Sequence, residues 1–316
     1  MTSLPLRAGL VGLGAMGRNH ARVLANLGGV DLVGVVEPMS DAEAAYGAPV
    51  FSTVEELIAL GADYVVVACP TALHAEVGLK LAEAGICALI EKPLAHTVQA
   101  ARRLVEAFRS RGLVAGVGHI ERFNPALLSL RTRLETGELG DVYQVVTRRQ
   151  GPYPHRIADV GVVEDLASHD IDLTSWLTSQ EYASVTAHTV SKNGRSHEDM
   201  VAVTGQLADS TVVNHLVNWL SPLKERTTVV TGEHGCFVVD TLSTGLTYFA
   251  NGEENMVRCP VPKREPLVVE HEHFRDAVRG KPAEIVPLHH GLRTVRVSAA
   301  VIESAQRGIT VTLRDK

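Results

Sequence analysis

The stretch RAGLVGLGAMGRNH, residues 7 to 20, decides the expected fold of the first half of the chain. An apolar run leads into GLGAMG, residues 12 to 17, and a helical pattern follows directly. In this context Gly12 permits a tight turn, Gly14 lets backbone approach a pyrophosphate, and Gly17 lets helix and strand pack closely. The N–H groups that open the helix then favour the phosphates. We therefore expect a dinucleotide-binding loop; an ordinary glycine-rich turn is the alternative.

The rest of the chain shows two different patterns of apolar residues. Apolar runs at residues 7–13, 31–37, 49–51, 63–69, 87–91 and 113–118 alternate with amphipathic helical patterns, which predicts a parallel sheet with crossover helices. Beyond residue 123, longer alternating segments predict an antiparallel sheet, with helices at about 125–137, 267–279 and 288–307. We expect an α/β protein: an N-terminal doubly wound parallel Rossmann sheet, residues 1–119, and a C-terminal α+β domain, residues 120–316, on a large, mostly antiparallel open sheet.

Composition excludes several classes of protein. The 316 residues carry a net charge of -6, with 45% hydrophobic and 21% charged residues, which is typical of a soluble globular protein. No basic excess indicates a nucleic-acid partner, and the longest apolar stretches fall short of the roughly twenty residues that cross a bilayer. The four cysteines, Cys69, Cys87, Cys236 and Cys259, share no CxxC spacing. We therefore expect a cytoplasmic protein without disulfides or a thiolate zinc site.

Glu37 ends the second predicted strand, about 20 residues after Gly17. An acidic side chain there accepts hydrogen bonds from the adenosine ribose and repels a 2′-phosphate, which favours NAD over NADP. No Arg or Lys occurs from Pro38 to Val50 to neutralise such a phosphate, although Arg18 could still reach it. A solvated carboxylate at a strand end is the alternative interpretation.

Three more segments follow strand ends: CPTALH at 69–74, EKP at 91–93 and GHIERFNPA at 118–126. Because the carboxyl ends of parallel strands meet at one edge, we expect these segments to line one crevice with the glycine loop. Lys92 brings an ammonium to that edge, and the following proline restrains its backbone; an exposed surface lysine is the alternative. The expected cofactor-binding residues are Gly12, Leu13, Gly14, Ala15, Met16, Gly17, Glu37, Cys69, Pro70, His74, Glu91, Lys92 and Pro93.

VEDLASHDIDLTSWL, residues 163 to 177, has helical periodicity. Asp165, His169 and Asp172 fall at i, i+4 and i+7, on one face. A histidine flanked by carboxylates is held in one tautomer and acts as a general acid or base near neutral pH. Two other interpretations stay open: a solvated His/Asp face, and a metal site, which ranks last because no third His or Cys is in register.

Taken together, GLGAMGRNH, CPTALH, EKP and EDLASHDID resemble the glucose-fructose oxidoreductase, inositol dehydrogenase and rhizopine-catabolism (Gfo/Idh/MocA) family. The resemblance implies tightly held NAD(H) or NADP(H), a sugar, cyclitol or sugar-nucleotide substrate, and oligomer contacts through the open sheet, as a homodimer or homotetramer. It implies that Lys92 is the lysine of the family's EKP motif. It also implies that Asp165 and His169 are its DxxxH pair.

Two segments, GHIERFNPA and residues 148–172, are similar to the subgroup that contains UDP-N-acetylglucosamine 3-dehydrogenases. The guanidinium groups in and near these segments suit such a substrate, because arginine binds phosphate bidentately. Tyr153 would add stacking or a hydrogen bond. The expected substrate-binding residues are Arg122, Asn124, Arg149, Tyr153, Arg156 and Asp172.

We therefore expect oxidation of a secondary alcohol on a pyranose ring, at C3 of a UDP-N-acetylhexosamine, with hydride transfer to nicotinamide. His169 takes the hydroxyl proton, Asp165 orients the imidazole of His169, and Lys92 stabilises charge on the reacting oxygen. The roles of Lys92 and His169 are exchangeable, since a cationic nicotinamide favours neutral lysine. The alternatives are a keto-sugar reductase, an inositol or sugar dehydrogenase, an NAD-dependent glycoside hydrolase, and a non-enzymatic NAD-sensing regulator.

Overall fold

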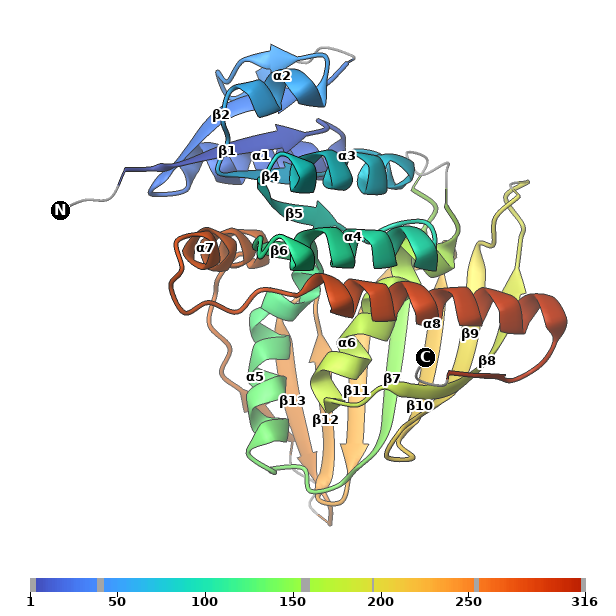
Figure 1. Ribbon diagram of the computed structural model, residues 1–316. Helices are drawn as coiled ribbons and strands as arrows, with labels where there is room; N and C mark the ends of the chain where they lie inside the picture. Colours follow the sequence, from blue (N-terminus) through green and yellow to red (C-terminus); the bar gives the residue numbers. More distant parts are fainter. Residues whose placement is uncertain (1–3, 39–42, 155–159, 195, 253–255, 314–316) are drawn as a thin grey trace. The chain divides into compact units, whose positions relative to one another are not determined.

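The computed structural model describes residues 4–38, 43–154, 160–194, 196–252 and 256–313. The chain forms two compact units, each built on its own sheet (Figure 1). Unit 1 comprises Met1–Ile120 and Glu265–Val295, and unit 2 comprises Glu121–Arg264 and Arg296–Lys316. The sequence had placed every residue from 120 to 316 in the second domain, whereas residues 265–295 pack with the first unit.

Aromatic packing explains why this late segment joins unit 1. Helix α7 (Pro266–Val278) contributes Phe274, whose ring is 1% exposed and lies edge-on to Tyr64, with ring centroids 5.4 Å apart. Tyr64 is itself fully buried at the start of the fourth strand. Burial of two aromatic rings stabilises this contact by more than their apolar area alone, and no local sequence pattern predicts it.

The sheet of unit 1 is parallel and has six strands in the order β3-β2-β1-β4-β5-β6. The strands are β1 (Leu6–Val11), β2 (Val30–Val36), β3 (Val50–Phe51), β4 (Tyr64–Val67), β5 (Cys87–Glu91) and β6 (Ala115–Gly118). Every predicted strand of this half is confirmed, and the order is that of a Rossmann fold. The order reverses between β1 and β4, and a ligand crevice is expected beyond the carboxyl ends of the strands at such a point.

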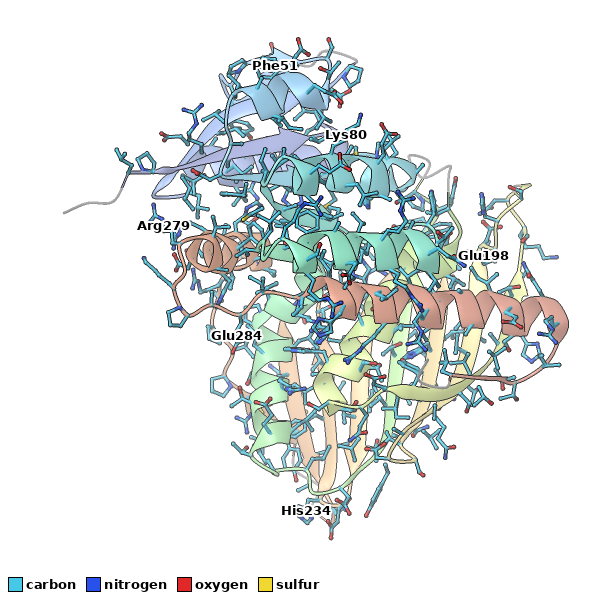
Figure 2. The ribbon with its side chains drawn as sticks, in the orientation of Figure 1. Phe51, Lys80, Glu198, His234, Arg279 and Glu284 are labelled. Carbon is cyan, nitrogen blue, oxygen red and sulfur yellow. The ribbon has the colours of Figure 1, made fainter. Side chains whose placement is uncertain are left out.

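Two of the helices of unit 1 begin at threonine caps. The helices of this unit are α1 (Ala15–Asn26), the 3-10 turn η1 (Glu43–Ala45), α2 (Val54–Ala59), α3 (Thr71–Glu83), α4 (Val98–Ser110) and α7, and α8 (Leu288–Arg307) starts here. Thr53 caps α2 in a reciprocal pair with Glu56, and Thr97 caps α4. Lys80 of α3, labelled in Figure 2, pairs with Glu55 at 2.9 Å, an exposed ion pair that adds little stability.

The sheet of unit 2 has nine strands in the order β14-β13-β12-β11-β7-β10-β9-β8-β15. The strands are β7 (Val142–Pro152), β8 (Tyr182–Val190), β9 (Met200–Leu207), β10 (Val212–Asn218), β11 (Leu220–Gly232), β12 (Gly235–Asp240), β13 (Gly245–Ala250), β14 (Met256–Cys259) and β15 (Val311–Thr312). All neighbours are antiparallel except β7 and β10, which run parallel. The predicted large, mostly antiparallel open sheet is confirmed.

Alternation along the strands separates the two faces of this sheet. On β10, Val213 and Val217 are fully buried, whereas Val212 and Leu216 are 40% and 37% exposed. The buried side chains pack with residues of α5 (Pro125–Glu135) and α6 (Ser168–Thr178) in one hydrophobic core. The period of two therefore gives one covered face and one face that carries exposed apolar side chains.

The helices of this chain also bear on membrane topology. Within the described ranges, no helix combines the length and the apolar character that crossing a membrane requires.

Candidate functional site

The three glycines of the loop between β1 and α1 have different surroundings. A Cβ at Gly12, where φ is +96°, would lie 2.8 Å from the carbonyl oxygen of Ala68, and a Cβ at Gly17 would lie 2.0 Å from the carbonyl oxygen of Gly12. A Cβ at Gly14 would meet nothing within 4 Å. The first and third positions are thus tight turns and contacts inside the protein, while the second is open to a ligand, as a pyrophosphate loop requires.

The start of α1 suits an anion as well. Gly14 is the N-cap, no side chain caps the helix, and its first turn holds no carboxylate. The N–H groups and the helix dipole there favour phosphate. Beside this loop, Oε2 of Glu37 accepts a hydrogen bond from the backbone N–H of Leu13 at 2.8 Å. The Glu37 carboxylate is therefore fixed at the end of β2, where the ribose of a dinucleotide is expected.

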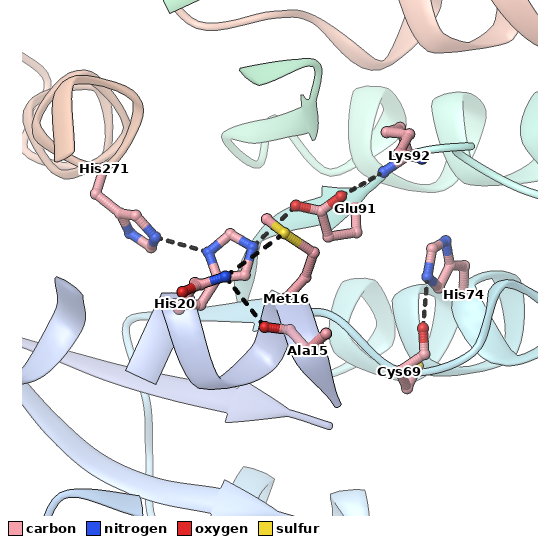
Figure 3. A network of polar contacts seen from close by, with 9 residues as sticks. Ala15, Met16, His20, Cys69, His74, Glu91, Lys92 and His271 are labelled. Carbon is pink, nitrogen blue, oxygen red and sulfur yellow. Dashed lines mark hydrogen bonds and ion pairs between the residues drawn. The ribbon is translucent and has the colours of Figure 1, made fainter. Parts of the chain in front are cut away.

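Lys92 directly follows β5, and a buried polar network lies behind it (Figure 3). Its backbone N–H donates to Oε2 of Glu91 at 3.1 Å, and Oε1 of the same carboxylate lies 2.9 Å from Nε2 of His20. Nδ1 of His20 in turn lies 2.8 Å from Nε2 of His271. Gly118 leaves room for the carboxylate, because a Cβ there would lie 2.9 Å from Oε1 of Glu91.

Burial and neighbouring charge set the protonation of this network. Burial raises the pKa of Glu91, but the hydrogen bond and charge of His20 and the charge of Lys92 outweigh it, and the pKa is lowered. Burial holds the pKa of His271 well below its usual value. Burial and the charge of Glu91 hold the pKa of Glu270 well above its usual value. Neither carboxyl oxygen of Glu270 has a hydrogen-bond partner among the described residues.

His74 supports the same segment from α3. Its Nδ1 lies 2.9 Å from the carbonyl oxygen of Pro93 and its Nε2 lies 3.0 Å from that of Cys69, so the ring braces the loops that follow β4 and β5. The peptide bond between Lys92 and Pro93 is cis. The sequence had assigned His74 to cofactor binding. The ring is 1% exposed and both of its nitrogens contact backbone, so its role in this structure is to hold the loops.

The helical segment of unit 2 that carries Asp165 and His169 is not one continuous α-helix. Val163–Ala167 form a π-helical turn, and α6 begins at Ser168. Asp165 thus lies in the π-turn and His169 in the first turn of α6, and both are half-buried. The even i, i+4, i+7 face that the sequence predicts is interrupted at this junction, because a π-turn adds a residue to the helical repeat.

Gly161 and Glu198 explain where the π-turn begins. Oε1 of Glu198, labelled in Figure 2, accepts a hydrogen bond from the backbone N–H of Val163 at 2.9 Å. A Cβ at Gly161 would lie 2.1 Å from that same oxygen. The glycine therefore makes room for the side chain that satisfies a backbone donor at the start of the turn. Neither residue was singled out from the sequence, and a glycine just before a helix was the only signal.

Two buried arginine pairs support the same region. Nε of Arg149 donates to Asp170 at 2.9 Å and Nη1 donates to Glu121 at 2.8 Å. Arg122 binds both carboxylate oxygens of Asp172, at 2.8 and 2.5 Å. Although burial lowers the pKa of Arg149, the carboxylates of Asp170 and Glu121 raise it above its usual value.

These pairs change the role expected of three predicted substrate ligands. Arg122, Arg149 and Asp172 are each less than one-tenth exposed and bind protein partners. A fourth, Asn124, caps α5 by accepting from the N–H of Ala126 at 3.0 Å. All four therefore hold the fold of unit 2 in this structure. The sequence missed this because each partner lies far along the chain or in a cap.

The two remaining predicted substrate ligands have different outcomes. Tyr153 is half-buried, with its ring edge-on to Trp219 at 5.5 Å between centroids. Arg156 lies outside the described residues. Tyr153 therefore keeps a partly exposed ring near the end of β7 and stays a prediction.

Comparison with known proteins adds an independent finding. The model of an oxidoreductase family with an NAD-binding Rossmann fold, GFO/IDH/MocA, matches residues 6–119, and the model of the GFO/IDH/MocA C-terminal domain matches residues 127–238. UDP-N-acetylglucosamine 3-dehydrogenase of Acidithiobacillus ferrooxidans is 30% identical over 285 residues, 86% of this chain and 88% of that protein. The chain belongs to the Gfo/Idh/MocA family.

Solved structures and other relatives agree with this family assignment. A structure of the A. ferrooxidans enzyme superposes on this Gfo/Idh/MocA protein with a TM-score of 0.88, at 27% identity, and covers 96% of this chain and 99% of that one. Inositol 2-dehydrogenase 2 of Saccharopolyspora erythraea is 33% identical over 205 residues, but the match spans only 60% of that relative and 62% of this chain. GenD2 from gentamicin A biosynthesis, solved with NAD, gives a TM-score of 0.87 at 27% identity and covers 99% of this chain and 97% of that one.

Family membership and the glycine loop together settle the cofactor class. Residues 6–119 are the NAD-binding Rossmann domain of an oxidoreductase. The surroundings of Gly12, Gly14 and Gly17 fit the diphosphate of NAD, and the Glu37 carboxylate fits its ribose.

Proposed function

We propose that this Gfo/Idh/MocA oxidoreductase oxidises a secondary alcohol of a UDP-N-acetylhexosamine, at C3 of the sugar, with NAD as the hydride acceptor. The match to the UDP-N-acetylglucosamine 3-dehydrogenase supports this substrate, because it extends over 86% of the chain and so includes most of unit 2. An inositol is the second candidate substrate. The 33% identity to an inositol 2-dehydrogenase favours it, although over a shorter stretch.

The chain's own residues divide the work of this reaction. His169 takes the proton of the reacting hydroxyl, Asp165 holds the imidazole in the productive tautomer, and Lys92 stabilises charge on the oxygen. NAD, when bound, supplies the acceptor for the hydride. Three features support these assignments. Lys92 directly follows a strand of the Rossmann sheet, Asp165 and His169 are half-buried, and the neighbouring carboxylates on α6 are paired with arginines.

A panel of alcohols tests the function. UDP-N-acetylglucosamine, myo-inositol and scyllo-inositol are each incubated with the protein and NAD, and reduction is followed by nicotinamide absorbance. We expect turnover with the sugar nucleotide. Turnover with an inositol alone would assign the second substrate class, and cleavage of a chromogenic glycoside without net NADH would indicate a hydrolase. NAD binding without turnover of any compound would leave a regulator.

Variants of Lys92 and His169 test the assigned roles. Lys92→Ala and His169→Asn are each expected to lower kcat by about 10²–10⁴-fold, the usual share of a proton-transfer or charge-stabilising group. NAD affinity, measured by quenching of protein fluorescence, should change little. Lys80→Ala, an exposed lysine on α3, is the matched control and should keep full activity. Retained turnover in Lys92→Ala would remove Lys92 from the mechanism.

The open face of the unit 2 sheet supports a homo-oligomer. Leu216, Phe249 and Met256 lie on that face and are 37%, 40% and 54% exposed. A second copy of the chain is the proposed cover, because a two-fold axis brings the same apolar residues together from both copies. Leu216→Lys should dissociate the assembly in light scattering; an unchanged mass would place the contact elsewhere. The cysteines are free thiols, which fits the proposed cytoplasmic location.

A further inference from the structure

A buried chain of polar contacts connects α7 to the backbone of Lys92. It runs from Nε2 of His271 to Nδ1 of His20 at 2.8 Å, from Nε2 of His20 to Oε1 of Glu91 at 2.9 Å, and from Oε2 of Glu91 to the N–H of Lys92 at 3.1 Å (Figure 3). His20 and His271 are fully buried. They are thus placed to act through Glu91, and neither has surface to offer a ligand.

We infer that His20 is a positioning residue, which fixes the Glu91 carboxylate and through it the backbone that carries Lys92. This inference rests on the proposed role of Lys92. His20 lies on α1, the helix that opens at the glycine loop, so the contact links the phosphate-binding helix to the strand end that bears the lysine.

The direction of the hydrogen bonds supports this role. Glu91 is an acceptor for two donors, the N–H of Lys92 and Nε2–H of His20. The other ring nitrogen of His20, Nδ1, lies 2.8 Å from Nε2 of His271, so both nitrogens of the His20 ring have a partner. Burial holds the pKa of His271 well below its usual value, so this ring is neutral near pH 7. The buried imidazole of His271 therefore fixes the orientation of the His20 ring, as partners of functional histidines commonly do.

Several other charged or titratable groups also face Glu91. His20 comes from α1, Lys92 from the end of β5, His74 from α3, and Glu270 and His271 from α7. The neighbouring strand β6 contributes Gly118, which has no side chain. Of these groups, His20 has the side chain that hydrogen-bonds the carboxylate. Without it, burial would dominate, and the pKa of Glu91 would rise.

Two variants of His20 separate positioning from bulk packing. His20→Leu fills the space but offers no donor, whereas His20→Gln places an amide N–H near the position of Nε2. Near neutral pH, we expect kcat of His20→Leu to fall roughly tenfold to a hundredfold, as for a lost hydrogen bond to a charged group. The Kd for NAD should change little, and His20→Gln should keep most of the activity.

The pH profile distinguishes this role from a merely structural one. In His20→Leu, kcat should show an additional rise with pH as the Glu91 carboxyl ionises, beyond any dependence on His169 that both proteins share. The wild-type enzyme lacks this additional step because its Glu91 is already ionised. Glu270→Gln is the control: it replaces a carboxyl that does not hydrogen-bond Glu91 and whose pKa burial holds well above its usual value, and its profile should match wild type. An equal loss at every pH, without rescue by glutamine, would overturn the inference.

Two measurements need no substrate. In protein labelled with 13C at glutamate carboxyls, the Glu91 resonance, assigned with Glu91→Gln, should titrate at higher pH in His20→Leu than in wild type. Amide exchange at Lys92 should be faster in the same variant. An unchanged Glu91 titration or unchanged Lys92 exchange would overturn the inference whatever the turnover assay gives. If the wild-type protein oxidises none of the alcohols, the proposed function fails, and these two measurements still decide the positioning of the Lys92 backbone.

Discussion

The two units surround their candidate catalytic residues with different kinds of ionisable side chain. Behind Lys92 in unit 1 lie two histidines and two glutamates, His20, His271, Glu91 and Glu270. Burial lowers the pKa of His271 and raises that of Glu270. Around α6 in unit 2 lie arginine–carboxylate pairs, and guanidinium stays charged at any ordinary pH. The first support therefore responds to pH, while the second fails only when a partner is removed.

The largest effect on stability is expected in unit 2. Arg149→Leu leaves the buried carboxylate of Asp170 and the half-buried carboxylate of Glu121 without their cation, so the free energy of unfolding should fall by about 3–5 kcal/mol. Urea denaturation measures this. Arg148→Leu is the matched control on the same strand; that side chain is 55% exposed and pairs loosely with Glu225, so its change should stay within about 0.5 kcal/mol. Equal losses in both variants would contradict a special role for the buried pair.

Two glycine variants in unit 1 distinguish a glycine needed for packing from a glycine needed for NAD binding. Gly17→Ala forces a Cβ against the backbone of Gly12 and should lower stability by about 1–3 kcal/mol. Gly14→Ala meets no protein atom within 4 Å and should leave stability within about 0.5 kcal/mol, yet weaken NAD because the methyl group occupies the approach of the pyrophosphate. Thermal denaturation and calorimetric NAD titration give both values. Full NAD affinity in Gly14→Ala would place the diphosphate elsewhere.

The smallest effect, that of one carboxyl over a single pH unit, tests the pH response directly. Because the folded protein raises the pKa of Glu270 above 4.5, this group's stabilisation is complete below about pH 4.5 and is lost as pH rises towards the folded value. Glu270→Gln removes that loss. The variant should match wild type near pH 4 and gain on it at higher pH, by at most about 1.4 kcal/mol per pH unit for one proton. A constant difference between the two proteins would show that Glu270 ionises normally.

His271 contributes pH dependence of the opposite sign. Its pKa is lowered from 6.5 in the folded protein, so its stabilisation is complete above about pH 6.5 and is lost as pH falls. The lowered pKa of Glu91 adds a further loss below about pH 4.5. Stability is lost at acid pH through His271 and Glu91 and at higher pH through Glu270, so unit 1 should be most stable between acid and neutral pH. Denaturation at several pH values would locate this maximum.

Features that depend on residues close together in the sequence were predicted, whereas contacts between residues far apart in the sequence were missed. The strands of unit 1, the glycine loop and the helices near 125, 267 and 288 were predicted because each depends on the spacing of neighbouring residues. The Glu91 network was missed: His20 and Glu91 are 71 residues apart, and His20 and His271 are 251 apart. The available signals were the glutamate of EKP and the neighbouring ionisable residues Glu270 and His271.

The helix that carries Asp165 and His169 shows a different limit. Its periodicity was correct from Ser168 onward, but the π-turn before it was not foreseen, because the turn depends on Glu198 reaching the backbone of Val163. The same holds for Arg122 and Arg149. Their residue type suggested phosphate binding. Only the fold showed that their N–H groups donate to carboxylates 50 and 21 residues away in the sequence.

Sequence alone fixed the class of each unit and the family chemistry, since apolar periodicity and glycine spacing act over a few residues and need no partner. Tertiary structure decided which charges neutralise one another and which side chains stay accessible. Coulombic and hydrogen-bond energies depend on distances of a few ångströms, and packing sets those distances between residues that the chain keeps far apart.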